Sequence, residues 1–269
     1  MSADPRDEVA GWWATAVSRI EPGVIELRGH PVQELIGTTS LVGMIWLMLR
    51  GEPAPPGAAA LLEAALVASV DHGPQAPSIA IARMTATCGV GLNSAVASGV
   101  NALGDVHGGA GQQCVELLDE ICAARGADGD LAVAAAEVVG RWRARSAYLP
   151  GFGHRFHPVD PRRAPLLALV DDAVRDGVVA GNHVAAGRAV EELLGARVPM
   201  NIDGATAIIY AELGFPPPLA RGLFVLSRSV GILAHAWEET QQGRRIKGPI
   251  PPSIRPAYLG PATPGHGLR

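Results

Sequence analysis

Apolar residues recur at steps of three and four positions along almost the whole chain of 269 residues. This spacing lines one face of an amphipathic helix. It predicts helices over Val9–Ala16, Pro31–Ile36, Ser40–Leu49, Ala58–Ala68, Ser78–Ala86, Leu92–Leu103, Gly111–Ala124, Leu131–Arg145, Pro165–Asp176, His183–Leu194, Ile202–Leu213 and Leu219–Gln241. The alternation typical of a strand is clear over Gly23–Arg28, which we expect to form one edge of a hairpin. The pattern as a whole predicts an all-α protein.

Composition supports closely packed helices. Apolar residues make up 48% of the chain but aromatic residues only 4%, so Ala, Leu and Val must fill the core. A β-sandwich would require more aromatic and β-branched residues. The length allows one large or two modest domains, and the net charge of −4 argues against a general nucleic-acid binder.

The sequence also indicates a compartment. Its three cysteines, Cys88, Cys114 and Cys122, show neither CxxC spacing nor an even-numbered framework, so we expect reduced thiols. The N-terminus is acidic and lacks the order of a signal peptide. The apolar run Leu41–Leu49 is too short to span a bilayer. We therefore expect a soluble, cytoplasmic protein that binds no membrane.

Three histidines and one aspartate lie in glycine- or proline-marked turns between the predicted helices. They are His72 in D-H-G-P, His107 in V-H-G-G-A, His154 in P-G-F-G-H-R and Asp203 in P-M-N-I-D-G. Imidazoles titrate near neutrality, and a partly desolvated carboxylate can act as a base. The set suggests acid–base chemistry on a bound carbonyl compound.

Each position also has a plainer interpretation. A turn histidine such as His72 is usually a surface residue. His107 precedes a predicted helix N-terminus, which disfavours imidazolium, so we expect a neutral hydrogen-bond donor there. His154 and His157 are three residues apart, but no nearby acid or cysteine completes a metal site, and none is expected. Gly89-Val90-Gly91 lacks the third glycine of a dinucleotide-binding fingerprint.

Taken in order, the four turns resemble those of the citrate synthase superfamily. S-G-V-N-A-L-G-D-V-H-G-G-A, P-G-F-G-H-R-F-H-P-V-D-P-R and L-F-V-L-S-R-S-V-G-I-L-A-H carry the resemblance, which runs from about Arg28 to Tyr258. The D-H-G-P and N-I-D-G turns look like those of citryl-CoA lyases and of the lyase-like domain of ATP-citrate lyase. Synthases more often have H-E-x-N and V-D-F-Y-S-G there.

The resemblance implies a role for each acid–base residue. Asp203 matches the base that removes, or returns, the methyl proton of acetyl-CoA. His107 matches the donor that polarises the thioester oxygen, and His154 matches the residue that handles the oxygen of the four-carbon side. Coenzyme A is then a substrate in thioester form, and no permanently bound cofactor is expected.

The resemblance also implies binding residues. Those expected to hold the carboxylates of oxaloacetate or the citryl group are His72, Arg162 and Arg228. A further arginine reaches over from the partner subunit of a homodimer, and Arg245 and Arg255 are both candidates. The residues expected to bind coenzyme A are Leu149, Pro150, Gly151, Phe152, Gly153 and Arg155.

We expect two helical domains, one combining Met1–Ala110 with Thr206–Arg269 and a smaller one over Gly111–Ala205, with an active-site cleft between them. The preferred reaction is cleavage of citryl-CoA to acetyl-CoA and oxaloacetate. Citrate or 2-methylcitrate synthesis remains open, as does a catalytically idle relative that binds coenzyme A. The chain lacks an ATP-grasp or CoA-ligase portion, so a separate citryl-CoA synthetase is a candidate partner.

Overall fold

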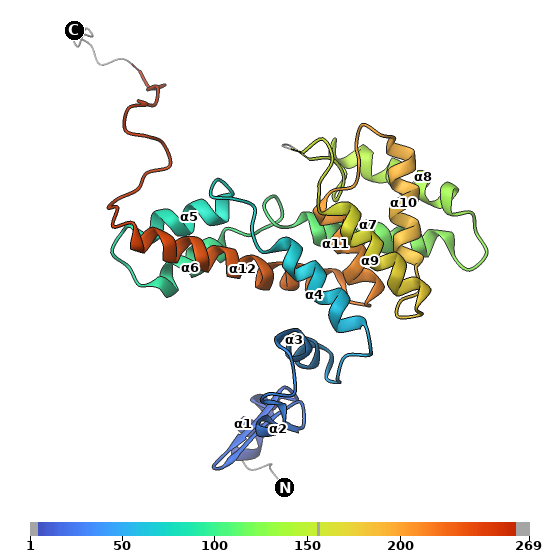
Figure 1. Cartoon of the computed structure of the whole chain (residues 1–269), viewed down its shortest axis with the longest axis horizontal. Coiled ribbons are helices and arrows are strands. Elements are labelled where there is room, and N and C mark those ends of the chain that lie inside the picture. The colour runs from blue at the N-terminus through green and yellow to red at the C-terminus, as the bar shows by residue number, and fades with distance from the viewer. Residues whose placement is uncertain (1–4, 155–156, 262–269) are drawn as a thin grey trace. The chain divides into compact units, whose positions relative to one another are not determined.

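The computed structural model describes residues 5–154 and 157–261, and its chain divides into two compact units (Figure 1). The first unit comprises Met1–Val70 and Gly108–Ser227, and the second comprises Asp71–His107 and Arg228–Arg269. Helices predominate in both, which confirms the predicted fold class. The boundaries of these units differ from those of the two domains expected from the sequence, and that expected division stays a prediction.

The first unit begins with a helix and a small sheet. Helix α1 (Pro5–Trp12) precedes antiparallel strands β1 (Ser18–Glu21), β2 (Val24–Leu27) and β3 (His30–Pro31), and a short α2 (Val32–Leu35) follows. The helix predicted to run to Ala16 was therefore too long, and β1 was not predicted. The reason is cross-strand pairing: β1 gains its hydrogen bonds only by lying against β2. Helical periodicity in the preceding residues contains no information about that pairing.

Helices α3 (Leu41–Arg50) and α4 (Ala58–Ser69) join this segment to the main core of the first unit. Ser40 caps α3 by accepting a hydrogen bond from the Gly43 N–H at 3.0 Å. Trp46 then packs edge-on against Phe215, with ring centroids 5.3 Å apart. Arg50 donates to the Gly214 carbonyl at 2.8 Å, so both ends of α3 are fixed.

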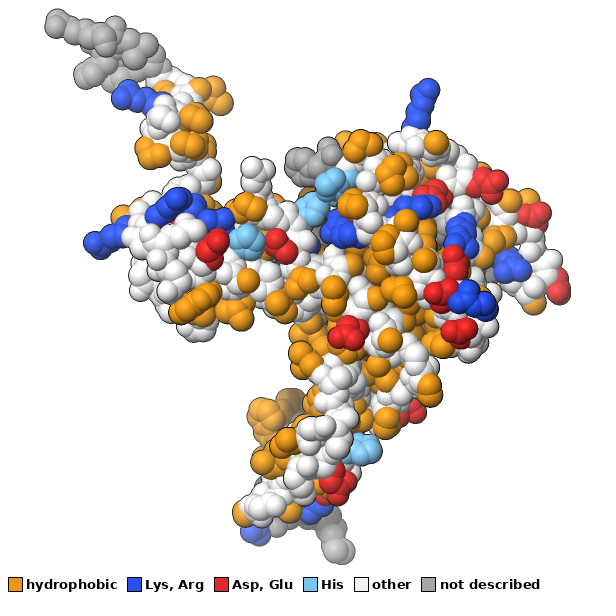
Figure 2. All heavy atoms as spheres, in the orientation of Figure 1, with side chains coloured by type: hydrophobic (Ala, Val, Ile, Leu, Met, Phe, Trp, Pro, Cys, Tyr) orange, Lys and Arg blue, Asp and Glu red, His pale blue; other side chains and the backbone are white. Residues whose placement is uncertain are grey.

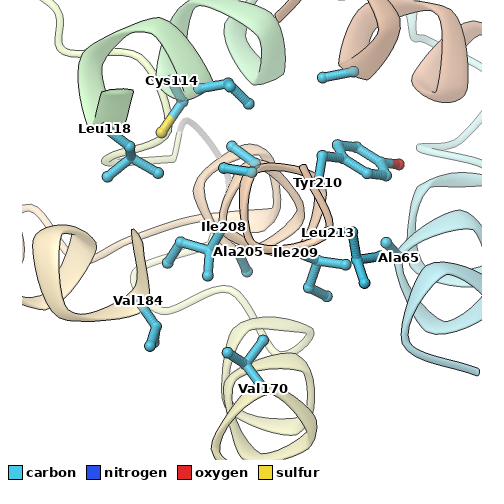
Figure 3. Close-up of a cluster of buried hydrophobic side chains, with 14 of the residues drawn as sticks. Ala65, Cys114, Leu118, Val170, Val184, Ala205, Ile208, Ile209, Tyr210 and Leu213 are labelled. Atoms are coloured by element: carbon cyan, nitrogen blue, oxygen red, sulfur yellow. The ribbon is translucent and has the colours of Figure 1, made fainter. Parts of the chain in front are cut away.

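The core of the first unit surrounds one central helix, α11 (Ile202–Glu212). Nearly every residue of α11 is buried, as expected for a helix that is apolar on all sides. Figure 3 shows its side chains facing Cys114 and Leu118, Val170, Val184 and, on another side, Ala65. The helices that pack on α11 are α4, α7 (Ala110–Arg125), α9 (Arg163–Arg175) and α10 (Asn182–Leu194), and α8 (Leu131–Arg145) packs on α7 and α10. On the outer surface over α9 and α10, acidic and basic side chains lie next to one another (Figure 2) and form ion pairs such as Arg188–Asp171.

The second unit is built on the C-terminal half of a long helix, α12 (Pro217–Gln241), which begins in the first unit. Helices α5 (Pro77–Ala86) and α6 (Leu92–Asn101) pack on one another and on this part of α12 (Figure 1). Buried Glu239 of α12 pairs with Arg83 of α5 and with Lys247, each at 2.7 Å. Burial alone would raise the pKa of Glu239, but the two cationic hydrogen bonds outweigh it and lower that pKa.

By length and composition, α12 could cross a membrane. A single helix of this kind is weak evidence, because core helices of globular proteins pass the same test. The buried face of α12 includes Arg228 and Glu239 as well as Ile232 and Ala236.

A matched pair of glycines tests the packing of α6. A Cβ on Gly99 would lie 2.7 Å from the Ser78 carbonyl and 2.8 Å from Ile232, whereas one on Gly140 in α8 meets nothing within 4 Å. We expect Gly99→Ala to lower the free energy of unfolding by about 1–3 kcal/mol through overpacking. Gly140→Ala should raise it by about 0.5–1 kcal/mol through helix propensity. Urea denaturation measures both, and equal effects would contradict the close approach.

Candidate active site

The N-terminus of α11 presents Asp203 in the first unit. Asn201 caps the helix, and its Oδ1 accepts from the N–H groups of Asp203 at 2.9 Å and Gly204 at 3.2 Å. Asp203 is half-buried while the rest of the first turns of α11 is buried. The cap therefore places a partly desolvated carboxylate at the positive end of the helix dipole.

The segment that carries His154 is attached to the same helix end. Asn201 N–H donates to the Gly151 carbonyl at 3.0 Å, and Asn201 Nδ2 donates to the Gly153 carbonyl at 2.6 Å. A side chain on Gly204 would come within 2.4 Å of the Gly151 carbonyl, so the two backbones meet without room for a Cβ. The structure thus brings the predicted positions His154 and Asp203 to neighbouring segments of one unit.

The predicted coenzyme A segment lies at this junction. The side chains of Leu149 and Phe152 are buried, each 7% exposed, and Phe152 bridges to Met200. Gly151 is buried too, so a ligand here would meet mainly the partly exposed Pro150 and Gly153. Arg155, the last predicted member of the segment, lies outside the described residues.

Asp160 fixes Arg162 beside the helix end. The carboxylate of Asp160 is buried and accepts from Arg162 Nε and Nη2, both at 2.9 Å, and from the Ile202 N–H at 3.1 Å. Burial would raise the pKa of Asp160, but these hydrogen bonds lower it to about 2. One edge of the Arg162 guanidinium is therefore used within the protein, and Nη1 donates to the Ala68 carbonyl at 3.4 Å. Any substrate carboxylate would have to contact the remaining N–H groups.

The His154 ring has a preferred orientation. Its Nδ1 accepts from the His157 N–H at 3.1 Å, and the two rings lie with centroids 4.7 Å apart. Burial lowers the pKa of His154, which Asp160 partly offsets and the nearby His157 and Arg162 lower further. A neutral ring with Nδ1 as acceptor carries its proton on Nε2.

Two buried groups border Asp203. Burial raises the pKa of the Cys114 thiol and of the Tyr210 hydroxyl, and the negative charge of Asp203 raises both further. Cys114 is 1% exposed. A buried, protonated thiol is inert, so Cys114 does not serve as a nucleophile.

The second unit holds His107 as a neutral imidazole. Its Nε2 accepts from the Ser78 N–H at 3.1 Å and lies 3.0 Å from Ser78 Oγ. Burial lowers the pKa of His107, and the charge of Arg228 lowers it further. Ser78 is in the first turn of α5, so its N–H belongs to a helix N-terminus that opposes imidazolium. The ring is left with its proton on Nδ1, in agreement with the expected neutral donor.

The remaining positions of the second unit that were predicted to bind carboxylates are His72 and Arg228. His72 is half-buried in the turn after α4, and Arg228 is 6% exposed on α12. The neighbouring Asp71 accepts from the Gly73 N–H at 3.1 Å and contacts His235 Nε2 at 3.3 Å. Burial would raise the pKa of Asp71, but the Gly73 and His235 contacts lower it overall.

Arg245 and Arg255 lie on exposed chain after α12, and the choice between them stays open. No group of three or more metal-ligating side chains gathers among the described residues. A pocket of about 550 Å³ lies between α8, α9 and α10 in the first unit, and none of its lining residues is a predicted site residue.

Sequence reasoning missed two supporting residues. Asn201, quoted only as part of a motif, holds both the Gly151–Gly153 backbone and the first turn of α11. An asparagine directly before a helical pattern is an N-cap signal that could have identified it. Ser78 was predicted only as the first residue of a helix, which in the structure begins at Pro77, and its contact with His107 was not predicted. Ser78 and His107 are 29 residues apart, so the periodicity of apolar residues does not predict their contact.

The His107 geometry predicts a measurable tautomer. With ¹⁵N-labelled histidine, we expect the neutral His107 ring to carry its proton on Nδ1 and to titrate below the ordinary value of 6.5. Arg228→Gln removes a nearby positive charge, so the pKa of His107 should rise. Ser78→Ala keeps the backbone donor and should preserve the tautomer. An Nε2-protonated ring, or a pKa at or above 6.5 in the unsubstituted protein, would contradict this geometry.

The fold of this chain is similar to that of solved lyase structures. Citryl-CoA lyase of Hydrogenobacter thermophilus is 30% identical, with a TM-score of 0.80 over 96% of this chain and 97% of that one. ATP citrate lyase of Methanothrix soehngenii, solved with citrate and coenzyme A, has a TM-score of 0.80 at 20% identity, over 97% of this chain and 45% of that one.

Comparison with curated sequences gives the family. Citrate synthase of Haloferax volcanii is 30% identical over 203 residues, which is 74% of this chain and 52% of that protein. The chain thus spans about half the length of the curated relatives it matches first. The family "Citrate synthase, C-terminal domain" matches residues 28–257. With the acid–base residues described above placed inside that match, the chain belongs to the citrate synthase family.

Proposed function

We propose that this enzyme cleaves citryl-CoA to acetyl-CoA and oxaloacetate. The observation that carries the proposal is the similarity to the lyase of Hydrogenobacter thermophilus, which extends over nearly the full length of both chains. Citrate synthases, in contrast, match over only part of their own length. The D-H-G-P and N-I-D-G turns at His72 and Asp203 support the same choice.

In this mechanism, His154 Nε2 takes the proton of the tertiary hydroxyl of citryl-CoA. This step requires the ring to carry its own proton on Nδ1 and so to give up the hydrogen bond that Nδ1 accepts from the His157 N–H. The carbon–carbon bond breaks as that oxygen becomes the carbonyl of oxaloacetate, and the bonding electrons pass to the acetyl-CoA enolate. His107 stabilises the enolate oxygen with its Nδ1–H, a role that such donors fill with about 3–4 kcal/mol of transition-state stabilisation. Asp203 must enter this step as the protonated acid; it gives its proton to the enolate carbon and ends as the carboxylate.

The predicted binding residues fit both the carboxylates of the substrate and its coenzyme A portion. His72, Arg162 and Arg228 would hold the carboxylates, because guanidinium N–H groups match planar oxyanions. The segment Leu149–Gly153 would contact coenzyme A through the partly exposed Pro150 and Gly153, because Leu149, Gly151 and Phe152 are buried. Coenzyme A thioesters are the substrates, and a separate synthetase would supply citryl-CoA.

Condensation of an acyl-CoA with oxaloacetate is the second candidate. One feature of the site favours it: the contact of His154 Nδ1 with the His157 N–H favours a proton on Nε2. That form donates to the carbonyl oxygen of oxaloacetate, as synthesis requires, whereas cleavage requires Nε2 to accept. A synthase must in addition admit water to hydrolyse the citryl thioester.

Paired assays separate the two reactions. The purified protein receives (3S)-citryl-CoA, with malate dehydrogenase and NADH reporting oxaloacetate, or acetyl-CoA and oxaloacetate with a thiol reagent. We expect rapid NADH oxidation with little free coenzyme A. Oxaloacetate-dependent release of coenzyme A would instead favour the synthase, and silence in both assays would overturn both candidates.

The same assays test Asp203. Asp203→Asn removes the proton-transferring carboxylate, and we expect turnover to fall by about 10²–10⁴-fold. Asp176→Asn changes an exposed carboxylate of the same unit and should leave the rate unchanged. Unchanged turnover in Asp203→Asn would rule out the mechanism in either direction.

We also propose a homodimer formed through α12. Val230, Leu233 and Trp237 lie on one helix face and are 58%, 46% and 56% exposed. Their spacing repeats after seven residues, as in the seam of a helix pair, and a second copy would present the same seam. The exposed arginines Arg245 and Arg255 follow on the same chain end, where one of them could reach the partner's site.

Light scattering after size exclusion tests the dimer. We expect twice the chain mass for the unsubstituted protein and the chain mass for Trp237→Asp, because a charge is placed in the seam. Tyr148→Asp alters an 87% exposed loop residue and should keep the dimer. A dimer that persists in Trp237→Asp would place the interface elsewhere.

A further inference from the structure

His235 and Asp71 form a contact that the proposed mechanism does not use. They are 164 residues apart, His235 in the second unit's part of α12 and Asp71 directly before His72. His235 Nε2 lies 3.3 Å from both oxygens of the Asp71 carboxylate. The side chain of His235 is 20% exposed and that of Asp71 is 43% exposed.

The Asp71 carboxylate shapes the turn that carries His72. It accepts from the Gly73 N–H at 3.1 Å, closing a side-chain turn around His72. Gly73 has a positive φ of 85°, so the turn depends on a glycine backbone. A group that holds Asp71 therefore holds the backbone from which the His72 imidazole projects.

Stability alone is a poor explanation of the contact. An ion pair with one partner this exposed contributes about 0–1 kcal/mol. His235 meanwhile has its Nδ1 buried without a hydrogen-bond partner among the described residues, which opposes folding. A histidine with one end unsatisfied and the other on a functional turn fits a positioning role better than a stabilising one.

The same helix carries Arg228, seven residues before His235. Seven residues are about two helical turns, so both side chains lie on one face, about 10 Å apart along the axis. Arg228 is 6% exposed, and its positive charge lowers the pKa of His107. Helix α12 thus interacts with His107 through Arg228 and with the turn that carries His72 through His235.

We propose that His235 is a positioning residue that holds the Asp71–Pro74 turn on α12 and thereby sets the His72 imidazole relative to Arg228. This inference rests on the proposed function in that both residues are taken to bind carboxylates of one substrate. His235 itself contacts no substrate. Its effect on oxaloacetate binding passes through Asp71 and the turn.

The chain offers a matched control. His183 Nε2 contacts Asp119 at 3.0 Å, with side chains 20% and 48% exposed. Its Nδ1 is likewise buried without a hydrogen-bond partner in the described part of the chain, although it lies 3.9 Å from Glu212 Oε1. This second histidine–aspartate pair joins α10 to α7 and touches no predicted site residue. His183→Ala therefore measures the loss of such a pair, together with the longer contact to Glu212, away from the predicted site residues.

The experiment compares His235→Ala, His235→Gln and His183→Ala in the full chain. We expect His235→Ala to raise the KM for citryl-CoA in cleavage, or for oxaloacetate if the enzyme condenses, about tenfold with a much smaller change in kcat, as for lost ground-state positioning. Gln reaches Asp71 with an N–H donor and should restore KM to within about threefold. His183→Ala should change neither constant.

A second readout does not depend on catalysis. Amide hydrogen exchange at Gly73 should become faster in His235→Ala, because the Asp71 carboxylate that accepts from this N–H is released, and should stay slow in His235→Gln and His183→Ala. If the unsubstituted protein neither cleaves nor condenses, the proposed function fails while this exchange still tests the positioning. Oxaloacetate affinity by calorimetry then replaces KM.

Unchanged KM and unchanged Gly73 exchange in His235→Ala would overturn the inference. Equal effects in His235→Ala and His183→Ala would overturn it as well, because they would show a general loss of stability. Should His235→Ala fail to fold, His235→Asn takes its place. Its amide is too short to reach Asp71, so it should behave unlike His235→Gln.

Discussion

The first unit depends on the contact between the Gly151–Gly153 backbone and the first turn of α11. Asn201 makes this junction by capping the helix with its side-chain oxygen while its nitrogen holds the Gly153 carbonyl. Gly151 and Gly204 allow the two backbones to meet, since a Cβ at either position would collide. The segment ending at His154 and the carboxylate of Asp203 are thereby fixed to each other through main-chain atoms, which move less than side chains. Asp160 adds a further connection from the Ile202 N–H to Arg162.

In the second unit, one helix fixes the predicted site residues relative to one another. The C-terminal half of α12 carries Arg228 near His107, His235 on the Asp71 turn, and Glu239 on Arg83 and Lys247. These residues follow one another at helical spacing on a single face, so the rigid helix sets their separations. A neutral His107 results, because burial, the Arg228 charge and the Ser78 N–H all oppose its protonation. A neutral imidazole can donate to a developing enolate and then release it more readily than an imidazolium would.

The sequence was most informative about structure that depends on interactions between neighbouring residues along the chain. The helices from α3 to α12 follow from apolar spacing with small errors at their ends, because a helix is defined by neighbours along the chain. Glycine- and proline-marked turns identified His72, His107, His154 and Asp203, since such turns are where a side chain can leave the packed core. Errors arose where distant segments meet. Strand β1 depends on β2 for its hydrogen bonds, and the α1 segment before it was predicted too long.

The sequence by itself determined the helical class and the family resemblance, and it proposed the titratable residues of the candidate site. The tertiary structure decided how those residues are held. It assigned Asn201 to the junction, Ser78 to His107 and His235 to Asp71, contacts that join positions up to 164 residues apart. It also decided which ring nitrogen of His107 and of His154 accepts a hydrogen bond. The reason is physical: tautomers and burial depend on the neighbours in space, and only folding brings those neighbours together.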